Sequence, residues 1–520
     1  MSLELSLVSL LPVIAPVVAA VLVLLLDAAV PQRREPHLVL GAAGLAAGLL
    51  GALPGLRLPA DDTRSALCLP DGWCAYRADH LTSALQVCAL LAALVVLVLA
   101  WRDWSAPGPG GGAEGTGRAP VVVALLLAAT AGVVAVPAAG DLGSLLVSLE
   151  LATLPTVALV ALVRTTWAAP RRARAVDGAV SLLTTSLVSF GLLALGAALW
   201  VAATGSTRFD GVPQVAHSEL LVLAAVLLVA GLAFKVSAVP FHAWTPITYA
   251  AAPLPVTAYL ATVSKVAALG GLVVVIRALG AVDGTTLVAI AVLAGASMTL
   301  GNLVALVQQD TVRLLAWSTV AQAGWVLLPL ASLSTRAARA AGSYLLVYVA
   351  ATLLAFVVLA AVVALVGGRE ATSLETQRGM LRSRPLLALP LGLALLTLAG
   401  LPPAVAGVVA KIVALRPVLG DETWWLALVA AVNIALGIAV YLRWLAVLVA
   451  PGSRRSPLVP VRVPAGGDSD APDQMPAAAG DRPDSAAGVR QPRVPARLWV
   501  LVGLLSAVLV LGSIAPIGIV

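Results

Sequence analysis

Charged residues are scarce in this 520-residue sequence, and their scarcity excludes most soluble architectures. Only 11% of the residues are Asp, Glu, Lys or Arg, whereas 60% are hydrophobic. A soluble globular domain has about a quarter of its residues charged. Apolar runs of about 20 residues recur along the chain, and each is long enough to cross a bilayer. The sequence therefore predicts an all-α, polytopic membrane protein that contacts the lipid bilayer and does not bind nucleic acid.

Cysteine and cofactor motifs are scarce as well. Three cysteines are too few for a disulfide framework, although Cys68 and Cys74 share one extramembrane loop and a bond between them is left open. The sequence has no Rossmann glycine pattern, no P-loop and no Cys/His cluster with metal-ligand spacing. We therefore expect no cofactor and no metal in this chain. The twelve tryptophans are expected to anchor helix ends at the membrane interface.

Lysine is the rarest basic residue, and its positions are informative. The chain has 32 Lys and Arg residues, of which only Lys235, Lys265 and Lys411 are lysines. All three lie in apolar segments, whereas nearly all the arginines lie in loops, near helix ends or in the C-terminal tail. Arginine stays protonated in proteins, whereas a buried lysine can lose and regain its proton. This distribution indicates amines that take part in proton exchange.

The apolar runs predict about fourteen membrane spans. Prolines interrupt the seventh and the twelfth, and each of these two spans also carries a lysine. Interrupted helices at corresponding places in two halves are typical of transporters built from inverted repeats. The arginine-rich loops place both termini outside. The spans are expected near 5–26, 37–56, 80–101, 119–137, 142–163, 178–204, 218–239, 252–277, 284–306, 311–331, 340–366, 386–414, 423–450 and 497–516.

The spacing of the breaks divides the chain into five parts. Two five-helix halves with inverted topology are expected, preceded by a three-helix segment and followed by a linker and a last span. The stretch 452–495 is expected to be disordered because it is rich in Pro, Ala, Gly, Asp and Arg without periodicity. The predicted boundaries are 1–118 for the N-terminal segment, 119–277 and 284–450 for the halves, 451–496 for the linker and 497–520 for the last helix.

One carboxylate and one imidazole accompany the lysines. Glu150 lies in the middle of the fifth span, where an ionised group costs several kcal/mol unless it has a partner. We expect it to pair with Lys235, and a pair that opens and closes can load and release a proton. A lone membrane lysine often reaches out to the interface, but Lys265 is about a dozen residues from either end of its span. His242, in the break, either relays protons or caps the broken helix.

Several segments together resemble a known family. FKVSAVPFHAWTPITYAAAPLPVTAYLATVSK, LLVSLELATLPTVALVAL, GNLVALVQQDTVRLLAWSTVAQAGW and LAGLPPAVAGVVAK are similar to segments of the antiporter-like subunits of respiratory complex I, the NADH-quinone oxidoreductase, in particular its N branch. The resemblance covers roughly residues 140–415. It implies a proton-translocating subunit in a bacterial inner membrane, with other complex I membrane subunits as partners. FMN, iron–sulfur clusters and quinone would belong to other subunits.

The resemblance also implies roles for individual residues. Glu150 would modulate Lys235, Lys265 would be the central lysine, and Lys411 the terminal lysine of the second half-channel. The sequence departs from the family pattern at Ile247, where an acidic residue is expected, and at Ser181, where a lysine is common.

Two alternatives remain open. The same relay suits a subunit of a multicomponent Na⁺/H⁺ antiporter or of a membrane-bound hydrogenase, and co-purifying subunits would distinguish these. A structural subunit that does not pump is the third reading. A scaffold, however, has no reason to keep charges within the lipid.

Overall fold

The computed structural model describes residues 6–29, 35–59, 62–105, 119–162, 169–209, 219–279, 284–367, 370–419, 423–451 and 493–514. Within these ranges, thirteen helical segments are long and apolar enough to cross a membrane. The predicted twelfth span is divided into two shorter helices, α15 and α16. The predicted all-α class with about fourteen spans is therefore confirmed. Of the stretch 452–495, for which disorder was expected, residues 452–492 lie outside the described residues.

The helices follow the predicted spans closely. Their bounds are α1 Leu7–Ala29, α2 Glu35–Ala52, α3 His80–Ser105, α4 Ala119–Ala135, α5 Leu142–Ala161, α6 Ala169–Thr204, α7 Glu219–Val236, α8 Trp244–Ala251, α9 Leu254–Ala261, α10 Val263–Leu279, α11 Gly284–Ala305, α12 Thr311–Leu327, α13 Ala337–Val366, α14 Met380–Ser383, α15 Pro385–Ala399, α16 Val405–Leu415, α17 Trp424–Val449 and α18 Ala496–Ile514.

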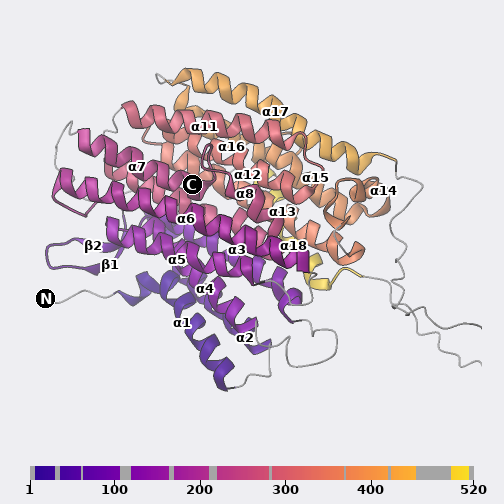
Figure 1. Cartoon of the computed structure of the whole chain (residues 1–520), viewed down its shortest axis with the longest axis horizontal. Helices are drawn as coiled ribbons and strands as arrows, with labels where there is room; N and C mark the ends of the chain where they lie inside the picture. Colours follow the sequence, from indigo (N-terminus) through magenta and orange to yellow (C-terminus); the bar gives the residue numbers. More distant parts are fainter. Residues whose placement is uncertain are drawn as a thin grey trace, which may run out of the picture.

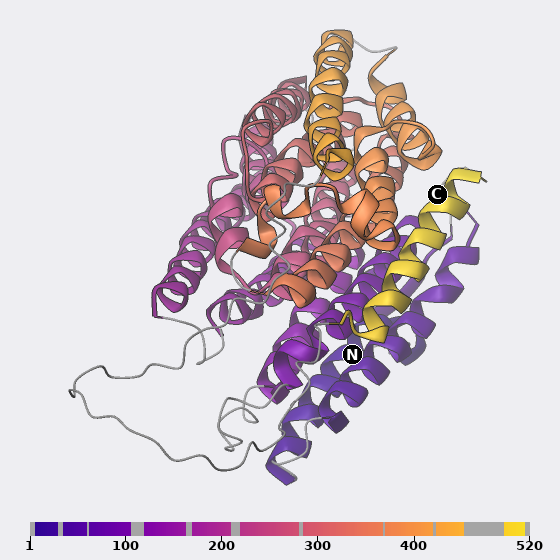
Figure 2. The same ribbon diagram turned by 90° about the vertical axis from the view of Figure 1, so that its right-hand side faces the viewer.

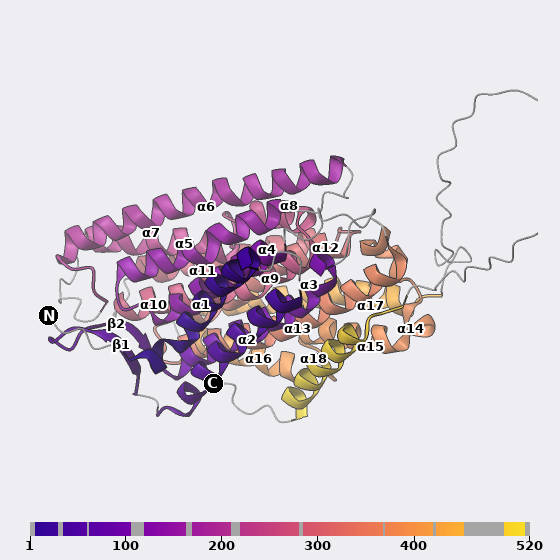
Figure 3. The ribbon, with the colours of Figure 1, turned by 90° about the horizontal axis from the view of Figure 1, so that it is seen from below.

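The helices lie side by side in one bundle, with α12 and α13 in its interior. The N-terminal helices α1 and α2 lie along one edge and α17 along the opposite edge (Figure 1). Seen from below, α6 lies at one side and α18 at the other (Figure 3). The inner helices α10, α12 and α13 are buried on most sides, whereas α5, α6 and α18 expose an apolar face. That exposed apolar face is what a lipid-facing helix requires.

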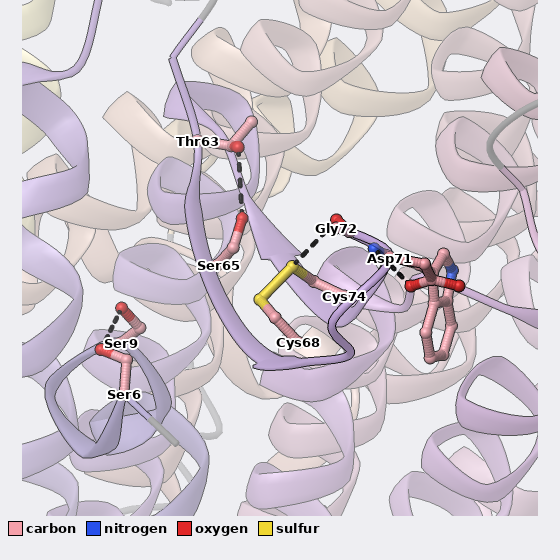
Figure 4. The surroundings of a disulfide bond; sticks show 9 residues. Ser6, Ser9, Thr63, Ser65, Cys68, Asp71, Gly72 and Cys74 are labelled. Carbon is pink, nitrogen blue, oxygen red and sulfur yellow. Dashed lines mark hydrogen bonds between the residues drawn. A yellow bond between two sulfur atoms is a disulfide. The ribbon is translucent and has the colours of Figure 1, made fainter. Parts of the chain in front are cut away.

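A small β-hairpin lies outside the helical bundle. Strands β1 (Arg64–Cys68) and β2 (Cys74–Ala78) pair antiparallel, with Cys68 opposite Cys74. A disulfide joins these two cysteines (Figure 4). The sequence left this bond open, and it did not predict the strands. Because disulfides persist mainly in oxidising compartments, the hairpin agrees with an extracytoplasmic location for this loop.

Three details differ from the predictions. The polar turn expected after the seventh span contains a short helix, α8, and α6 begins nine residues earlier than predicted, at Ala169 rather than near 178. The tryptophans are not all interfacial anchors, because Trp200, Trp325 and Trp444 are among the largest fully buried side chains. Burial of a tryptophan inside a membrane bundle depends on which helix faces it, which periodicity along one helix does not reveal.

Candidate functional site

The expected contact between Glu150 and Lys235 is present. The Lys235 Nζ lies 3.2 Å from Glu150 Oε1, and their side chains are only 10% and 17% exposed. The same ammonium donates to Thr153 Oγ1 at 2.8 Å and to Ser186 Oγ at 3.0 Å. An ammonium has three N–H donors, so this one is fully satisfied.

Local signals fix the helix that carries Glu150. Asp141 caps α5: its carboxylate accepts from the Ser144 amide at 2.7 Å, and the Ser144 hydroxyl accepts from the Asp141 amide at 3.2 Å. This reciprocal capping box satisfies two backbone N–H groups that a helix start leaves free. Gly132 of α4 lets α5 approach closely, since a Cβ there would lie 2.3 Å from the Ala152 nitrogen. Glu150 and Thr153 then share one face of α5, as residues three apart do.

Hydroxyl groups lie around Lys235. A cavity beside it opens between α5, α6, α7 and α10. Water needs polar partners to occupy a buried space, and these hydroxyls supply them. The cavity is therefore suited to hold water beside Lys235. Its hydroxyl-bearing lining residues are Thr153, Thr156, Thr185, Ser186, Ser189 and Ser264.

The first break brings Lys265 to the end of α7. Lys265 Nζ donates to the Lys235 carbonyl at 3.1 Å and to Ser237 Oγ at 2.6 Å, and it lies 4.9 Å from the centre of the Trp244 ring. Ser237 has a φ of 73°, in the left-handed region that favours glycine. Residues other than glycine that are held in this strained backbone conformation cluster at functional sites. Here the Ser237 hydroxyl contacts the amine.

Lys411 makes the same kinds of contact at the second break. Helix α15 ends at Ala399, and Gly400 follows with a φ of 73°. The Lys411 Nζ donates to the Ala399 carbonyl at 2.6 Å and lies 5.1 Å from the centre of the Trp325 ring. Gly400 is needed for two reasons, because a Cβ there would also lie 2.8 Å from Lys411 Cδ.

The two lysines therefore share one type of environment. Each meets the last carbonyls of a helix that stops inside the membrane, where the helix dipole is negative. Each also lies over the face of a tryptophan, which attracts a cation. Within the described residues, neither Lys265 nor Lys411 has a carboxylate partner. Their charges are compensated by carbonyl and hydroxyl dipoles and by the tryptophan ring, so loss of a proton from either amine would leave no unpaired carboxylate behind.

A second, smaller cavity lies between Lys265 and α12. It is lined by Lys265, Thr319, Gln322 and Tyr348 among other residues. The Tyr348 hydroxyl lies 3.0 Å from Thr319 Oγ1 and 2.8 Å from the Ala261 carbonyl. The two oxygens share the one phenolic proton of Tyr348, because the Thr319 hydroxyl donates its own proton to the Leu315 carbonyl.

Gln322 connects that cavity to the neighbourhood of Lys411. Its amide nitrogen donates to Tyr441 at 2.8 Å and reaches the Leu398 carbonyl at 3.4 Å, one residue before the carbonyl that holds Lys411. Its amide oxygen accepts a short hydrogen bond from Tyr344. The Tyr344 ring stacks on Trp325, the ring beneath Lys411. Polar groups thus lie at intervals between Glu150 and Lys411, but among the described residues no hydrogen bond joins Lys265 to Gln322 or Gln322 to Lys411.

His242 lies apart from this run. Its ring packs against Trp317 with 5.2 Å between ring centres, and its Nδ1 is buried without a hydrogen-bond partner among the described residues. None of the hydrogen bonds and ion pairs found in the described ranges joins it to a lysine. The alternative of a helix cap gains no support from that Nδ1 either.

The sequence analysis did not single out the tyrosines of this region or Ser186. The chain has only six tyrosines, and Tyr344 and Tyr348 are spaced to share one face of a helix. That rarity and that spacing were the available signal. No comparable signal marks Ser186, since hydroxyls in membrane helices usually bond their own backbone.

Comparison with protein families places the site in context. Residues 139–437 match a family model described as the membrane region of NADH:quinone oxidoreductases and Mrp antiporters. A protein of Salinispora tropica named NADH-quinone oxidoreductase subunit N is 42% identical over 463 residues, which cover 85% of this chain and 84% of that protein. The subunit N of Ectopseudomonas mendocina is 33% identical over 84% of this chain and 85% of its own length.

Solved structures share the fold. A chain of the respiratory complex I from Thermus thermophilus is 27% identical, with a TM-score of 0.74 and 97% of each chain covered. A chain of the Mrp complex from a Dietzia species is 22% identical, with a TM-score of 0.77, covering 98% of this chain and 95% of its own. The second likeness concerns the fold alone.

Proposed function

The chain belongs to the family of antiporter-like membrane subunits shared by NADH:quinone oxidoreductases and Mrp antiporters, and from this premise we propose that its buried amines form the proton path. Its function is that of a proton-translocating subunit of a bacterial NADH-quinone oxidoreductase, of the N type. It is a multi-pass protein of the bacterial inner membrane and works beside the other membrane subunits of the complex. Electron transfer through FMN, iron–sulfur clusters and quinone takes place in those other subunits.

The path begins at Glu150 and Lys235. A proton from the hydroxyl-lined cavity reaches the Lys235 amine, and Glu150 stabilises the resulting ammonium at 3.2 Å. When Glu150 moves away, the desolvated ammonium loses its counter-charge and releases the proton. Water carries it to the neutral form of the Lys265 amine, which lies at the end of α7 beside the Lys235 backbone carbonyl and the Ser237 hydroxyl. The separation of Glu150 from Lys235 is thus the step to which motion elsewhere in the complex is coupled.

The path continues through the second half. From Lys265 the proton crosses the cavity at Thr319 and Gln322 and reaches Lys411. The parts 119–277 and 284–450 act as the two half-channels, with His242 as a side residue at the first break. The observation that carries the proposal is the placement of three lysines inside the helical bundle, where they have a single carboxylate partner among the described residues and where cavities lie beside Lys235 and Lys265.

The two other readings are less well supported. The Mrp complex shares the fold at 22% identity, whereas the subunit N relative is 42% identical. A non-pumping scaffold would need no lysine at the end of a broken membrane helix, where the cost of the charge is highest.

The test replaces Lys235 with arginine. Arginine keeps the ion pair with Glu150 but cannot be deprotonated in a protein. We expect Lys235→Arg to assemble and to oxidise NADH, while membrane vesicles accumulate fewer protons per NADH. Arg208→Lys, at the extramembrane Asp71 contact, is the control and leaves the ratio unchanged. A Lys235→Arg complex that pumps like the natural one would refute the role of Lys235.

A further inference from the structure

Each break in a discontinuous helix is bonded to a serine from a different helix. Ser297 of α11 accepts a hydrogen bond from the Val239 amide, in the break after α7, at 2.9 Å. Ser513 of α18 accepts one from the Ala406 amide, in the first turn of α16, at 3.1 Å. Two serines on helices far apart in the sequence thus make the same kind of contact.

The two serines are also oriented in the same way. Ser297 donates its proton to the Leu293 carbonyl at 2.5 Å, and Ser513 donates to the Leu509 carbonyl at 2.8 Å. Each bond returns to the carbonyl four residues earlier in the serine's own helix. A hydroxyl has one proton, so its oxygen is left as a pure acceptor directed at the break.

The two amides need a partner for different reasons. Val239 lies in the break between α7 and α8, before the first residue of α8, whereas Ala406 lies in the first turn of α16, whose preceding residue Ala404 has no side chain that caps a helix. In a bilayer an unsatisfied N–H costs several kcal/mol, so a partner must be supplied from elsewhere. Ser513 supplies it to α16 as an N-cap residue does within its own helix, and Ser297 supplies it to the Val239 amide.

Both bonds lie next to the lysines. Val239 is two residues beyond Ser237, whose hydroxyl holds Lys265. Ala406 begins the short helix that carries Lys411. Helix α18 runs along the outside of the bundle, next to the N-terminal helices (Figure 2), and it packs against α13, α15 and α16 of the second half and against α3.

We propose that Ser297 and Ser513 are positioning residues that fix the two breaks and so aim Lys265 and Lys411 at their carbonyl partners. This role rests on the proposed function. It also gives α18 a part in proton transfer, although that helix lies outside both half-channels. Similarly, Ser297 ties a helix of the second half to the break of the first, so a movement of α11 changes the surroundings of Lys265.

Hydrogen–deuterium exchange tests the bonds themselves. The complex is compared with Ser297→Ala, Ser513→Ala and a control, Ser506→Ala, which removes a buried hydroxyl of α18 that has no partner among the described residues. We expect peptides with Val239 or Ala406 to exchange about fivefold faster in the matching variant, the factor given by loss of a typical cap. Unchanged exchange in both variants would overturn the proposal.

Proton pumping tests the consequence. Ser297→Ala and Ser513→Ala should lower the protons moved per NADH, Ser506→Ala should not, and Ser297→Thr or Ser513→Thr should restore the ratio by restoring the hydroxyl. A purely structural role would lower assembly and NADH oxidation together and leave the ratio intact, which would contradict the proposal. If Lys235→Arg pumps normally, the proposed function fails, and the exchange data still decide whether the serines hold the breaks.

Discussion

Ser237 offers the most informative pair of substitutions. Its side chain makes a left-handed backbone conformation costly, and its hydroxyl also accepts a hydrogen bond from Lys265. Its φ of 73° is costly for any residue with a Cβ, by about 1–2 kcal/mol. Its hydroxyl accepts from Lys265 Nζ at 2.6 Å and from Thr245 at 2.7 Å. A hydrogen bond to a charged group contributes about 1.5–3 kcal/mol.

Alanine and glycine separate these two contributions. Ser237→Ala loses the hydrogen bonds and keeps the backbone cost, so we expect a loss of about 1.5–3 kcal/mol of stability. Ser237→Gly loses the same bonds but is relieved of about 1–2 kcal/mol, so it should be the more stable of the two. Both should move fewer protons per NADH, because Lys265 loses the same acceptor in each.

The assay combines two measurements on the solubilised and reconstituted complex. Thermal unfolding of this subunit, followed by loss of its monodisperse complex, gives the order of stability, and vesicle acidification with NADH oxidation gives the pumping ratio. Equal stability of the two variants would refute the argument from φ. A normal ratio in either variant would refute the role of the hydroxyl.

Three further predictions address other parts of the molecule. Gly400→Ala should lower both stability and pumping, because its Cβ would lie 2.8 Å from the lysine of α16, whereas Gly367→Ala, with a φ of 70° and no atom within 4 Å of its added Cβ, should affect only stability. Tyr344→Phe should lower pumping, and it should lower the stability of the subunit by about 1–3 kcal/mol because the amide oxygen of Gln322 loses its hydrogen-bond donor. Unchanged pumping would exclude Tyr344 from the path. Burial alone would raise the pKa of Asp79, but the Arg277 guanidinium at 2.7 Å and hydrogen bonds from the first turn of α3 hold it below its ordinary 3.8. The stability that this depressed pKa provides is therefore present above about pH 4 and is lost as the pH falls below it, and Asp79→Asn should remove that acid-side loss in melting curves.

The membrane spans, the helix breaks and the charged residues of the site could be predicted from the sequence. Spans were predictable because each apolar run has the length of a membrane crossing. The breaks were predictable because proline cannot continue a helix. Lys235, Lys265, Lys411 and Glu150 stood out because a charge in lipid is costly and rarely accidental.

The remaining features depend on which helices meet. The pairing of Ser297 with Val239 joins residues 58 apart in sequence, and that of Ser513 with Ala406 joins residues 107 apart. Nothing along one helix distinguishes these serines from those that bond only their own backbone. The hairpin at β1 and β2 escaped prediction because five-residue strands within a polar loop carry a weak pattern. The short helix α8 was read as a turn because Pro246 lies within it and Pro240 and Pro253 lie on either side.

The most direct test of the account concerns Lys265, the amine between the two halves. Methionine at this position keeps the length and apolar packing of the side chain but removes the group that carries the proton. The measurement is the number of protons taken up by membrane vesicles per NADH oxidised, with the assembled complex quantified in the same membranes. We predict that Lys265→Met assembles and oxidises NADH but moves fewer protons per NADH. A ratio equal to that of the unaltered complex would contradict it.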